Sequence, residues 1–197
     1  MSASALRPAV FLDRDGTLTA EADWVRSKED LVLLASAAPA VELLHRAGFA
    51  VVVATNQSAV ARGFVTEAEL AAIHAHMVRE LERGGGKIAG VYVCPHHPTE
   101  GIPPYRRECE CRKPKPGLLR RAAAELGLDL ARSTIVGDKA SDLVPGRTVG
   151  AATVLVLTGY GLGEWEYRRP QFEVQPDHVA SDLLDAVDWA LARQVAA

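Results

Sequence analysis

The stretch Val10-Phe11-Leu12-Asp13-Arg14-Asp15-Gly16-Thr17 decides the fold. Its apolar half predicts a buried strand, and Gly16 allows the chain to turn sharply where that strand ends. Residues two apart in an extended chain point the same way, so we expect Asp13 and Asp15 to face one site. Two neighbouring carboxylates repel each other unless a cation or a proton lies between them. The stretch therefore predicts either a metal site or an acid–base pair, although a lone Asp-x-Asp also suits a solvated turn.

The bulk composition is that of an ordinary globular protein. A chain of 197 residues suits one domain with a full hydrophobic core, so we expect a single domain over residues 1–197. The net charge of −3 gives no reason to expect a nucleic-acid or membrane partner. The sequence has no apolar run of transmembrane length and no apolar signal core, so we expect a cytoplasmic protein, and a monomer.

Short apolar runs alternate with helical segments, which is the pattern of a parallel sheet covered by helices. We therefore predict an α/β fold, a three-layer Rossmann-like parallel sheet with helices on both faces. The runs are too short and too apolar to be half exposed, as expected for strands buried on both sides. The predicted strands are Ala9–Asp13, Ala50–Ala54, Gly90–Val93, Thr134–Gly137 and Ala152–Leu157.

The helices are delimited by proline, glycine and capping residues. One is predicted to start at Pro39 and end at Gly48, and another runs over residues 116–127. The pair Thr66–Glu69 has the spacing of a capping box. Ser181 is expected to cap the last helix, whereas Pro145 is expected to fit only a first helical turn.

Two stretches break this alternation. Residues 95–114 are rich in proline, cysteine and charge and are too long for an ordinary connection. Residues 159–176 form a charged excursion containing aromatic residues, for which a surface loop is the default interpretation.

Polar residues follow three of the predicted strands where each one ends. In open parallel sheets, ligands bind beyond the carboxyl ends of the strands. Thr55-Asn56-Gln57-Ser58 follows the second strand, and Asp138-Lys139 follows the fourth, with Asp142 four residues on. Taken singly, Thr55 suits a helix cap and Asp138 a loop, but together with the first stretch they predict one oxygen-rich site. Such a site favours a hard cation, so we expect Mg²⁺.

The cysteines form a second candidate metal site. Cys94, Cys109 and Cys111 lie close together in the sequence with His96 and His97. An odd number of cysteines in a cytoplasmic chain argues against a disulfide framework. Two ligand pairs, each spaced by one residue, suit a structural tetrahedral zinc, although reduced buried cysteines are the alternative.

The same loop is predicted to serve the oxygen-rich site. We favour His96 over His97 as the zinc ligand because its spacing from Cys94 mirrors that of the other pair. Arg112 and Lys113 follow the last cysteine directly. A zinc-pinned loop over residues 94–114 would hold these two cations beside the sheet edge.

These motifs together resemble the haloacid dehalogenase superfamily of phosphotransferases. Asp13-Arg14-Asp15-Gly16-Thr17, Thr55-Asn56, Lys113 and Gly137-Asp138 match its four motifs in order. With the zinc loop and Ala61-Arg62-Gly63, the chain is similar more narrowly to the heptose bisphosphate 7-phosphatase family. The similarity covers most of the chain and fades after about Gly161. The resemblance implies a sugar phosphate substrate and a fold without a large cap domain.

The resemblance also implies roles for the site residues. Asp13 would be the nucleophile that forms an aspartyl-phosphate, and Asp15 would protonate the leaving oxygen and then activate water. Thr55 and Lys113 would hold the transferring phosphoryl group. Mg²⁺ would bind Asp13, the backbone carbonyl of Asp15, and Asp138.

Substrate recognition is expected from the loops around this site. Arg112 and Arg62 are the candidates for the distal phosphate of a bisphosphate, and Lys139 would contact substrate or orient Asp13. The full set of expected substrate contacts is Arg14, Glu21, Ala22, Asp23, Trp24, Asn56, Gln57, Ser58, Arg62, Arg112 and Lys139.

Departures from the family pattern leave the substrate open. The chain has Asp23-Trp24-Val25 where the family usually has Gly-Tyr-Val, and Ala59 where it has glycine. A sibling activity, histidinol-phosphate phosphatase, would favour acidic contacts to an amine, and Glu21 and Asp23 suit it. A phosphoacceptor module without hydrolysis would have no use for Asp15, and a zinc-stabilised scaffold would leave the carboxylates unexplained.

Overall fold

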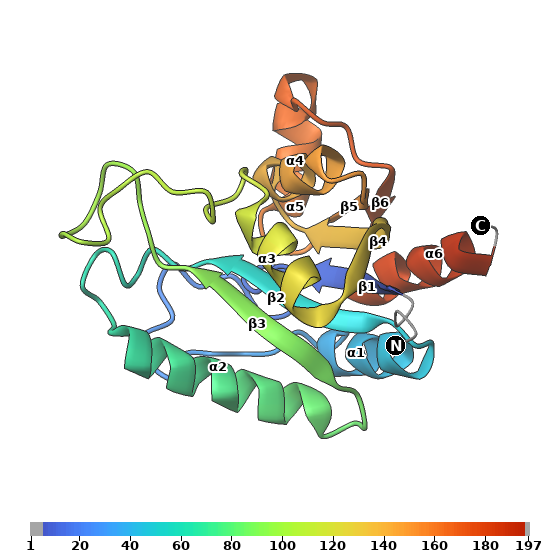
Figure 1. Cartoon of the computed structure of the whole chain (residues 1–197), viewed down its shortest axis with the longest axis horizontal. Helices are drawn as coiled ribbons and strands as arrows, with labels where there is room; N and C mark the ends of the chain where they lie inside the picture. Colours follow the sequence, from blue (N-terminus) through green and yellow to red (C-terminus); the bar gives the residue numbers. More distant parts are fainter. Residues whose placement is uncertain (1–5, 196–197) are drawn as a thin grey trace, which may run out of the picture.

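A six-stranded parallel sheet forms the centre of the computed structural model, which describes residues 6–195 (Figure 1). The strand order is β3-β2-β1-β4-β5-β6, and each neighbouring pair is parallel. The strands are β1 Arg7–Leu12, β2 Ala50–Asn56, β3 Ile88–Cys94, β4 Leu128–Gly137, β5 Ala152–Val156 and β6 His178–Ala180.

The register brings the carboxyl ends of β1 and β4 level with one another, while β2 continues beyond them to Asn56. Leu12, the last residue of β1, pairs with Val53 of β2 on one side and Val136 of β4 on the other. The strand order also changes direction at β1, with β2 and β3 on one side and β4 to β6 on the other. This edge is the place where open α/β sheets bind their ligands.

Helices cover both faces of the sheet, which confirms the predicted three-layer fold. On one face α1 packs between α2 and α6, and on the other α3 packs against α4. The stretch 159–176, for which a surface loop is the default interpretation, instead contains α5 and two short helices after β5 (Figure 1, orange). The bounds are α1 Ala37–Arg46, α2 Glu67–Glu82, α3 Gly117–Leu126, α4 Ala140–Thr148, α5 Gly161–Gly163, η1 Glu164–Arg168, η2 Arg169–Gln171 and α6 Leu183–Val195.

The alternation of side chains along β1 divides the core into two layers. Val10 and Leu12 pack in a cluster with α1, α2 and α6, whereas Ala9 and Phe11 pack with α3. All four are fully buried, so β1 is covered on both faces as its continuous apolar run predicts. The strand that carries the Asp13 loop is therefore enclosed on both faces from Pro8 to Leu12.

Several helix ends lie where the sequence places them. Thr66 and Glu69 form the predicted capping box at the start of α2. Gly127 ends α3 in the left-handed conformation, with a φ of 65°. The helix predicted from Pro39 begins two residues earlier, at Ala37, and ends at Arg46, just before Gly48.

Four local predictions are wrong. Asp182 rather than Ser181 caps the last helix, because its carboxylate accepts the backbone N–H of Asp185 at 3.1 Å. Pro145 lies beyond the first turn of α4, where it is buried and removes only one intrahelical hydrogen bond. Strand β4 starts at Leu128, well before the predicted start at Thr134, and strand β6 was not predicted. In both strands, exposed or part-exposed polar residues interrupt the apolar pattern.

Two long connections leave the sheet from the site edge. Residues 95–116, between β3 and α3, form an extended loop (Figure 1, yellow-green), in which Tyr105 hydrogen-bonds to Glu67 at the start of α2. The chain from 13 to 36, between β1 and α1, returns beside the ends of β1 and β2. Within residues 6–195, no helix combines the length and the apolar character needed to cross a membrane.

Candidate active site

A cavity of about 450 Å³ opens at the carboxyl ends of the central strands. Its walls come from the loops after β1, β2 and β4, from the zinc-loop end at Arg112 and Lys113, and from Tyr160 after β5. Most of the predicted site residues line it: Asp13, Arg14, Asp15, Glu21, Asp23, Trp24, Asn56, Gln57, Ser58, Arg112, Lys113 and Lys139.

The turn after β1 depends on a glycine. Gly16 has a φ of 76°, and a Cβ at this position would overlap the Asp138 carboxylate. Gly159, with a φ of 57°, approaches the same carboxylate from the loop after β5. The two glycines therefore bring two loops against Asp138, an approach that side chains would prevent.

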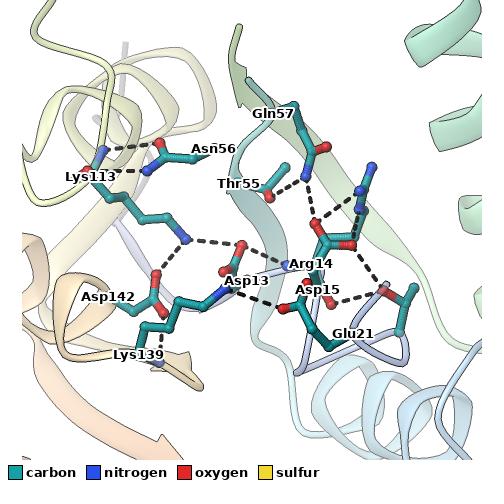
Figure 2. Close-up of polar contacts among 11 residues, drawn as sticks. Asp13, Arg14, Asp15, Glu21, Thr55, Asn56, Gln57, Lys113, Lys139 and Asp142 are labelled. Atoms are coloured by element: carbon teal, nitrogen blue, oxygen red, sulfur yellow. Dashed lines mark hydrogen bonds and ion pairs between the residues drawn. The ribbon is translucent and has the colours of Figure 1, made fainter. Parts of the chain in front are cut away.

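A buried lysine lies between two of the carboxylates (Figure 2). Lys113 Nζ is 2.9 Å from Asp13 Oδ1 and 2.6 Å from Asp142 Oδ1. Burial disfavours the charged forms, but the two carboxylates outweigh it and raise the pKa of Lys113. Burial likewise raises the pKa of Asp13, and Lys113, the Arg14 backbone N–H and Thr55 lower it to a net value below the usual range. Asp13 is thus an ionised carboxylate held against a cation.

The remaining acidic charge fits a divalent metal. Asp13, Asp138 and Asp142 offer carboxylate oxygens that lie within 4.8 Å of one another. Burial and the neighbouring Asp142 raise the pKa of Asp138 to about 8, and burial raises that of Asp142 to about 6. Asp138 Oδ1 is buried and has no hydrogen-bond partner among residues 6–195. An oxygen-only set with an unpartnered buried oxygen suits Mg²⁺.

Asp15 turns away from the metal cluster and is fixed by a separate network (Figure 2). Arg14 binds both of its carboxylate oxygens, from Nε and Nη2, at 2.8 Å each. Gln57 donates to Asp15 Oδ2 at 2.8 Å and to the Thr55 hydroxyl at 3.0 Å. Asp15 therefore lies beside Asp13 in the cavity with a defined orientation.

Asn56 fixes the backbone that presents Lys113. Its amide nitrogen donates to the Lys113 carbonyl at 3.1 Å, and its amide oxygen accepts the Lys113 N–H at 3.0 Å. This paired contact joins the end of β2 to the end of the 95–116 loop. Asn56, a predicted substrate contact, lines the cavity, and its side-chain amide also holds the Lys113 backbone.

The predicted zinc ligands come together at the end of β3 and in that loop. Cys94, His96, Cys109 and Cys111 offer ligand atoms within 4.8 Å of one another. Burial and the neighbouring Cys111 thiol raise the pKa of Cys94, so without a metal this sulfur is held as a neutral thiol. Three thiols and one imidazole suit a closed tetrahedral zinc site. His97 lies elsewhere, where its Nδ1 accepts the backbone N–H of Glu100 at 2.9 Å.

Other predicted substrate contacts are not at the cavity wall. Arg62 stacks on Trp24, with its guanidinium 5.0 Å from the ring centroid, and pairs with Glu100 at 3.5 Å. Arg62 was expected to meet a distal phosphate, and this placement makes it a support for Trp24. Ala22 packs against the core and does not line the cavity.

Asp142 and Tyr160 are two of the site residues that were assigned no role from the sequence. Asp142 is fully buried in the carboxylate cluster, and its position one turn into α4 was the available signal. Tyr160 lines the cavity and lies 4.4 Å from Lys139 Nζ, measured to the ring centroid. No motif indicated Tyr160, because it lies in the excursion after β5.

Comparison with known proteins identifies the family. Residues 110–186 match the HAD-hydrolase-like family model. The chain is 39% identical over 182 residues to D-glycero-beta-D-manno-heptose-1,7-bisphosphate 7-phosphatase of Vibrio cholerae, covering 92% of each chain. It is 41% identical over 190 residues to D-glycero-D-manno-heptose-1,7-bisphosphate 7-phosphatase of Thermosynechococcus vestitus, covering 93% of this chain and 95% of that one.

Solved structures agree with this assignment. The crystal structure of D,D-heptose 1,7-bisphosphate phosphatase from B. bronchiseptica, complexed with magnesium and phosphate, superposes with a TM-score of 0.82. That protein is 35% identical, and the match covers 94% of this chain and 99% of the other. The chain therefore belongs to the D-glycero-D-manno-heptose-1,7-bisphosphate 7-phosphatase family of HAD-like phosphatases.

Proposed function

We propose that this protein hydrolyses the 7-phosphate of D-glycero-D-manno-heptose 1,7-bisphosphate, in the biosynthesis of nucleotide-activated heptose. The observation that carries the proposal is the ionised Asp13 paired with Lys113 at 2.9 Å, with Asp15 beside it in the same cavity. This arrangement places a nucleophile, a cation for phosphoryl oxygens and an acid–base group around one position. The family membership supports the sugar bisphosphate as substrate.

In the first step, an Asp13 carboxylate oxygen attacks phosphorus and the bond from phosphorus to the sugar oxygen breaks. Asp15 gives its proton to that leaving oxygen, which becomes the hydroxyl of the product. In the second step, water attacks the phosphorus of the aspartyl-phosphate, gives a proton to Asp15, and releases inorganic phosphate and Asp13. Both steps use two carboxylates that have different ion-pair partners. Asp13 pairs with Lys113, and Asp15 pairs with Arg14.

Two cations offset the repulsion between Asp13 and the phosphate dianion. Lys113 is fixed by Asn56 and by its two carboxylate partners, so it is ready for the transferred group without rearrangement. Mg²⁺, held by Asp13, Asp138, Asp142 and the Asp15 backbone carbonyl, would supply further positive charge to the phosphoryl oxygens.

The outer half of the cavity would recognise the rest of the sugar bisphosphate. Arg112 lines the wall, and its Nη1 donates to the His96 carbonyl at 2.8 Å, which fixes the side chain from the zinc loop. Trp24 offers an aromatic surface supported by Phe64 and Arg62. Arg112 is therefore our candidate for the distal phosphate.

The structure disfavours a substrate amine at Glu21. Glu21 Oε2 is 3.2 Å from Lys139 Nζ, so this carboxylate already has a cation partner. Histidinol phosphate would have to displace that lysine or rely on Asp23.

We also propose that the enzyme acts as a cytoplasmic monomer.

The test combines substrate choice with an Arg112 variant. Wild type with Mg²⁺ should remove the C7 phosphate of the heptose bisphosphate faster than it hydrolyses histidinol phosphate, with phosphorus NMR identifying the phosphate lost. Arg112→Ala should raise KM for the bisphosphate far more than for a small monophosphate, because the guanidinium is replaced poorly by a neutral side chain. Preference for histidinol phosphate, or an equal loss on both substrates, would contradict the proposal.

A further inference from the structure

One histidine of α2 occupies a position where an apolar residue is expected. Leu70, Ile73, His74 and Met77 form the buried face of this helix, and His74 is only 5% exposed. A buried polar ring is costly unless it has a hydrogen-bond partner. The partner lies on another element: His74 Nε2 is 3.2 Å from Arg14 Nη1.

This contact completes the set of partners around a buried guanidinium. Arg14 is 1% exposed, and its Nε and Nη2 are both taken by the Asp15 carboxylate at 2.8 Å. The third nitrogen, Nη1, faces His74. A bidentate pair makes the guanidinium and the carboxylate share one plane, so a group that fixes one plane also fixes the other.

The histidine can serve Arg14 only as an acceptor. Arginine has donors but no acceptor, so the bond requires a lone pair on Nε2 of a neutral imidazole. Burial and the positive charge of Arg14 lower the pKa of His74 to about 3, which keeps the ring neutral. Three other cations have partners of their own. Arg26 lies over the Phe64 ring, Arg62 lies over the Trp24 ring, and Lys113 pairs with the carboxylates.

We propose that His74 is a positioning residue for catalysis, which holds the Arg14 guanidinium and thereby the Asp15 carboxylate in the orientation needed for proton transfer. The inference rests on the proposed function, because it assumes that Asp15 is the acid–base group. Its effect should therefore fall on the steps that use Asp15 and spare substrate binding.

The experiment compares three substitutions at position 74 with one control on the same helix. His74→Leu removes the acceptor. His74→Gln places an amide oxygen near the position of Nε2, whereas the shorter His74→Asn places it near Nδ1, out of reach of Arg14. His76→Leu is the matched control, since His76 is 26% exposed and faces Glu80.

We expect His74→Leu to lower kcat for the heptose bisphosphate about 10- to 100-fold, with KM changed less than about 3-fold, as for other losses of an orienting contact. His74→Gln should recover most of the rate, His74→Asn should not, and His76→Leu should match wild type. If His74→Leu does not fold, the Gln and Asn pair carries the comparison, because both keep a neutral amide on the helix.

A second readout separates this role from a merely structural one. Formation of the aspartyl-phosphate from p-nitrophenyl phosphate needs little help from an acid, whereas its hydrolysis needs Asp15 as a base. His74→Leu should therefore give a burst of p-nitrophenolate of one equivalent per active site, followed by slow turnover. The burst counts only active molecules, so loss of folded protein cannot imitate it.

The outcomes distinguish this inference from the proposed function. Wild-type kcat and no burst in His74→Leu, equal rescue by Gln and Asn, or a change in KM alone would overturn the role of His74. Those results would leave Asp13 chemistry intact. If the wild type forms no aspartyl-phosphate at all, the proposed function itself fails.

Discussion

The two ligand clusters of this molecule are built in opposite ways. The carboxylate cluster takes Asp13 and Asp138 from the ends of adjacent parallel strands and Asp142 from the helix that follows. The thiol cluster takes Cys94 from a strand end and its other three ligands from one long loop. The first is fixed by the sheet, and Lys113 offsets part of its charge. The cations beside the second cluster, Lys115 near Cys109 and Arg121 near Cys111, have exposed side chains, unlike the buried Lys113.

Because of this difference, the two metals would have different roles. A cation at the carboxylates acts on the substrate, whereas zinc at the thiols fixes a chain segment. The clusters meet where Arg112 and Lys113 leave Cys111 and enter the cavity. Asn56 ties that same segment to β2. Changes in each cluster should therefore have separable effects, which the following variants measure.

Asp13→Asn should have the largest effect. An amide cannot form the acyl-phosphate, so kcat should fall by at least about a thousand-fold. Zinc content should remain that of the wild type, because the thiol cluster is untouched. Steady-state phosphate release together with metal analysis checks both statements, and turnover near the wild-type rate would break the assignment of the nucleophile.

Lys113→Met should come next. The variant leaves Asp13 and Asp142 buried without their cation, so we expect kcat to fall about 100- to 1000-fold. Stability without Mg²⁺ should fall by about 3 kcal/mol, and added Mg²⁺ should restore part of it. Lys115→Met is the control, because Lys115 forms an ion pair with the exposed Glu110 carboxylate. Equal effects of the two substitutions in denaturant titrations and kinetics would contradict the buried-pair account.

Loss of zinc should have an intermediate effect. Cys109→Ser, or chelation of the wild type, should lower activity about 10- to 100-fold and lower Tm as well, because the loop carries Arg112 and Lys113. The wild type should contain about one zinc per chain. Glu110→Gln, an exposed change between the two cysteines, should behave as wild type. A zinc-free protein of normal activity would remove the link between the clusters.

Asn56→Leu should have the smallest effect. It removes both hydrogen bonds to the Lys113 backbone, and leaving these groups unpaired should cost about 1–3 kcal/mol of stability. We expect kcat to fall about 10-fold, with zinc retained. Asn56→Asp keeps the acceptor for the Lys113 N–H and loses the donor, so it should lie between. Combining Asn56→Leu with Cys109→Ser in a double-mutant cycle measures the coupling between the clusters, and strict additivity would show that they act independently.

The sequence predicts the parts of this molecule that depend on local pattern. Buried parallel strands are continuous apolar runs in the sequence, so these runs alone identify β1, β2 and β5. The edge of a parallel sheet gathers the residues that follow those runs, so Asp13 and Asp138 are predicted to meet, and the zinc-pinned loop is predicted to bring Lys113 to them. The zinc ligands are likewise predicted, because their spacing fits one coordination sphere.

The rest depends on side-chain directions that the pattern does not contain. Arg62 and Arg112 are both loop cations, yet Arg62 stacks on the Trp24 ring and Arg112 lines the cavity. Asp142 acquires its role only when α4 turns it toward Lys113. In the sequence, His74 fits the buried stripe of a helix like any other residue there. Only the structure shows that it contacts Arg14.

The most direct test of the account is to trap the aspartyl-phosphate in Asp15→Asn. With Mg²⁺ and p-nitrophenyl phosphate, this variant should release one equivalent of p-nitrophenolate per chain and then stop. Peptide mass spectrometry after acid quenching should find the phosphoryl group on Asp13. Sustained turnover by this variant, or a burst that leaves Asp13 unmodified, would contradict the division of labour between the two aspartates.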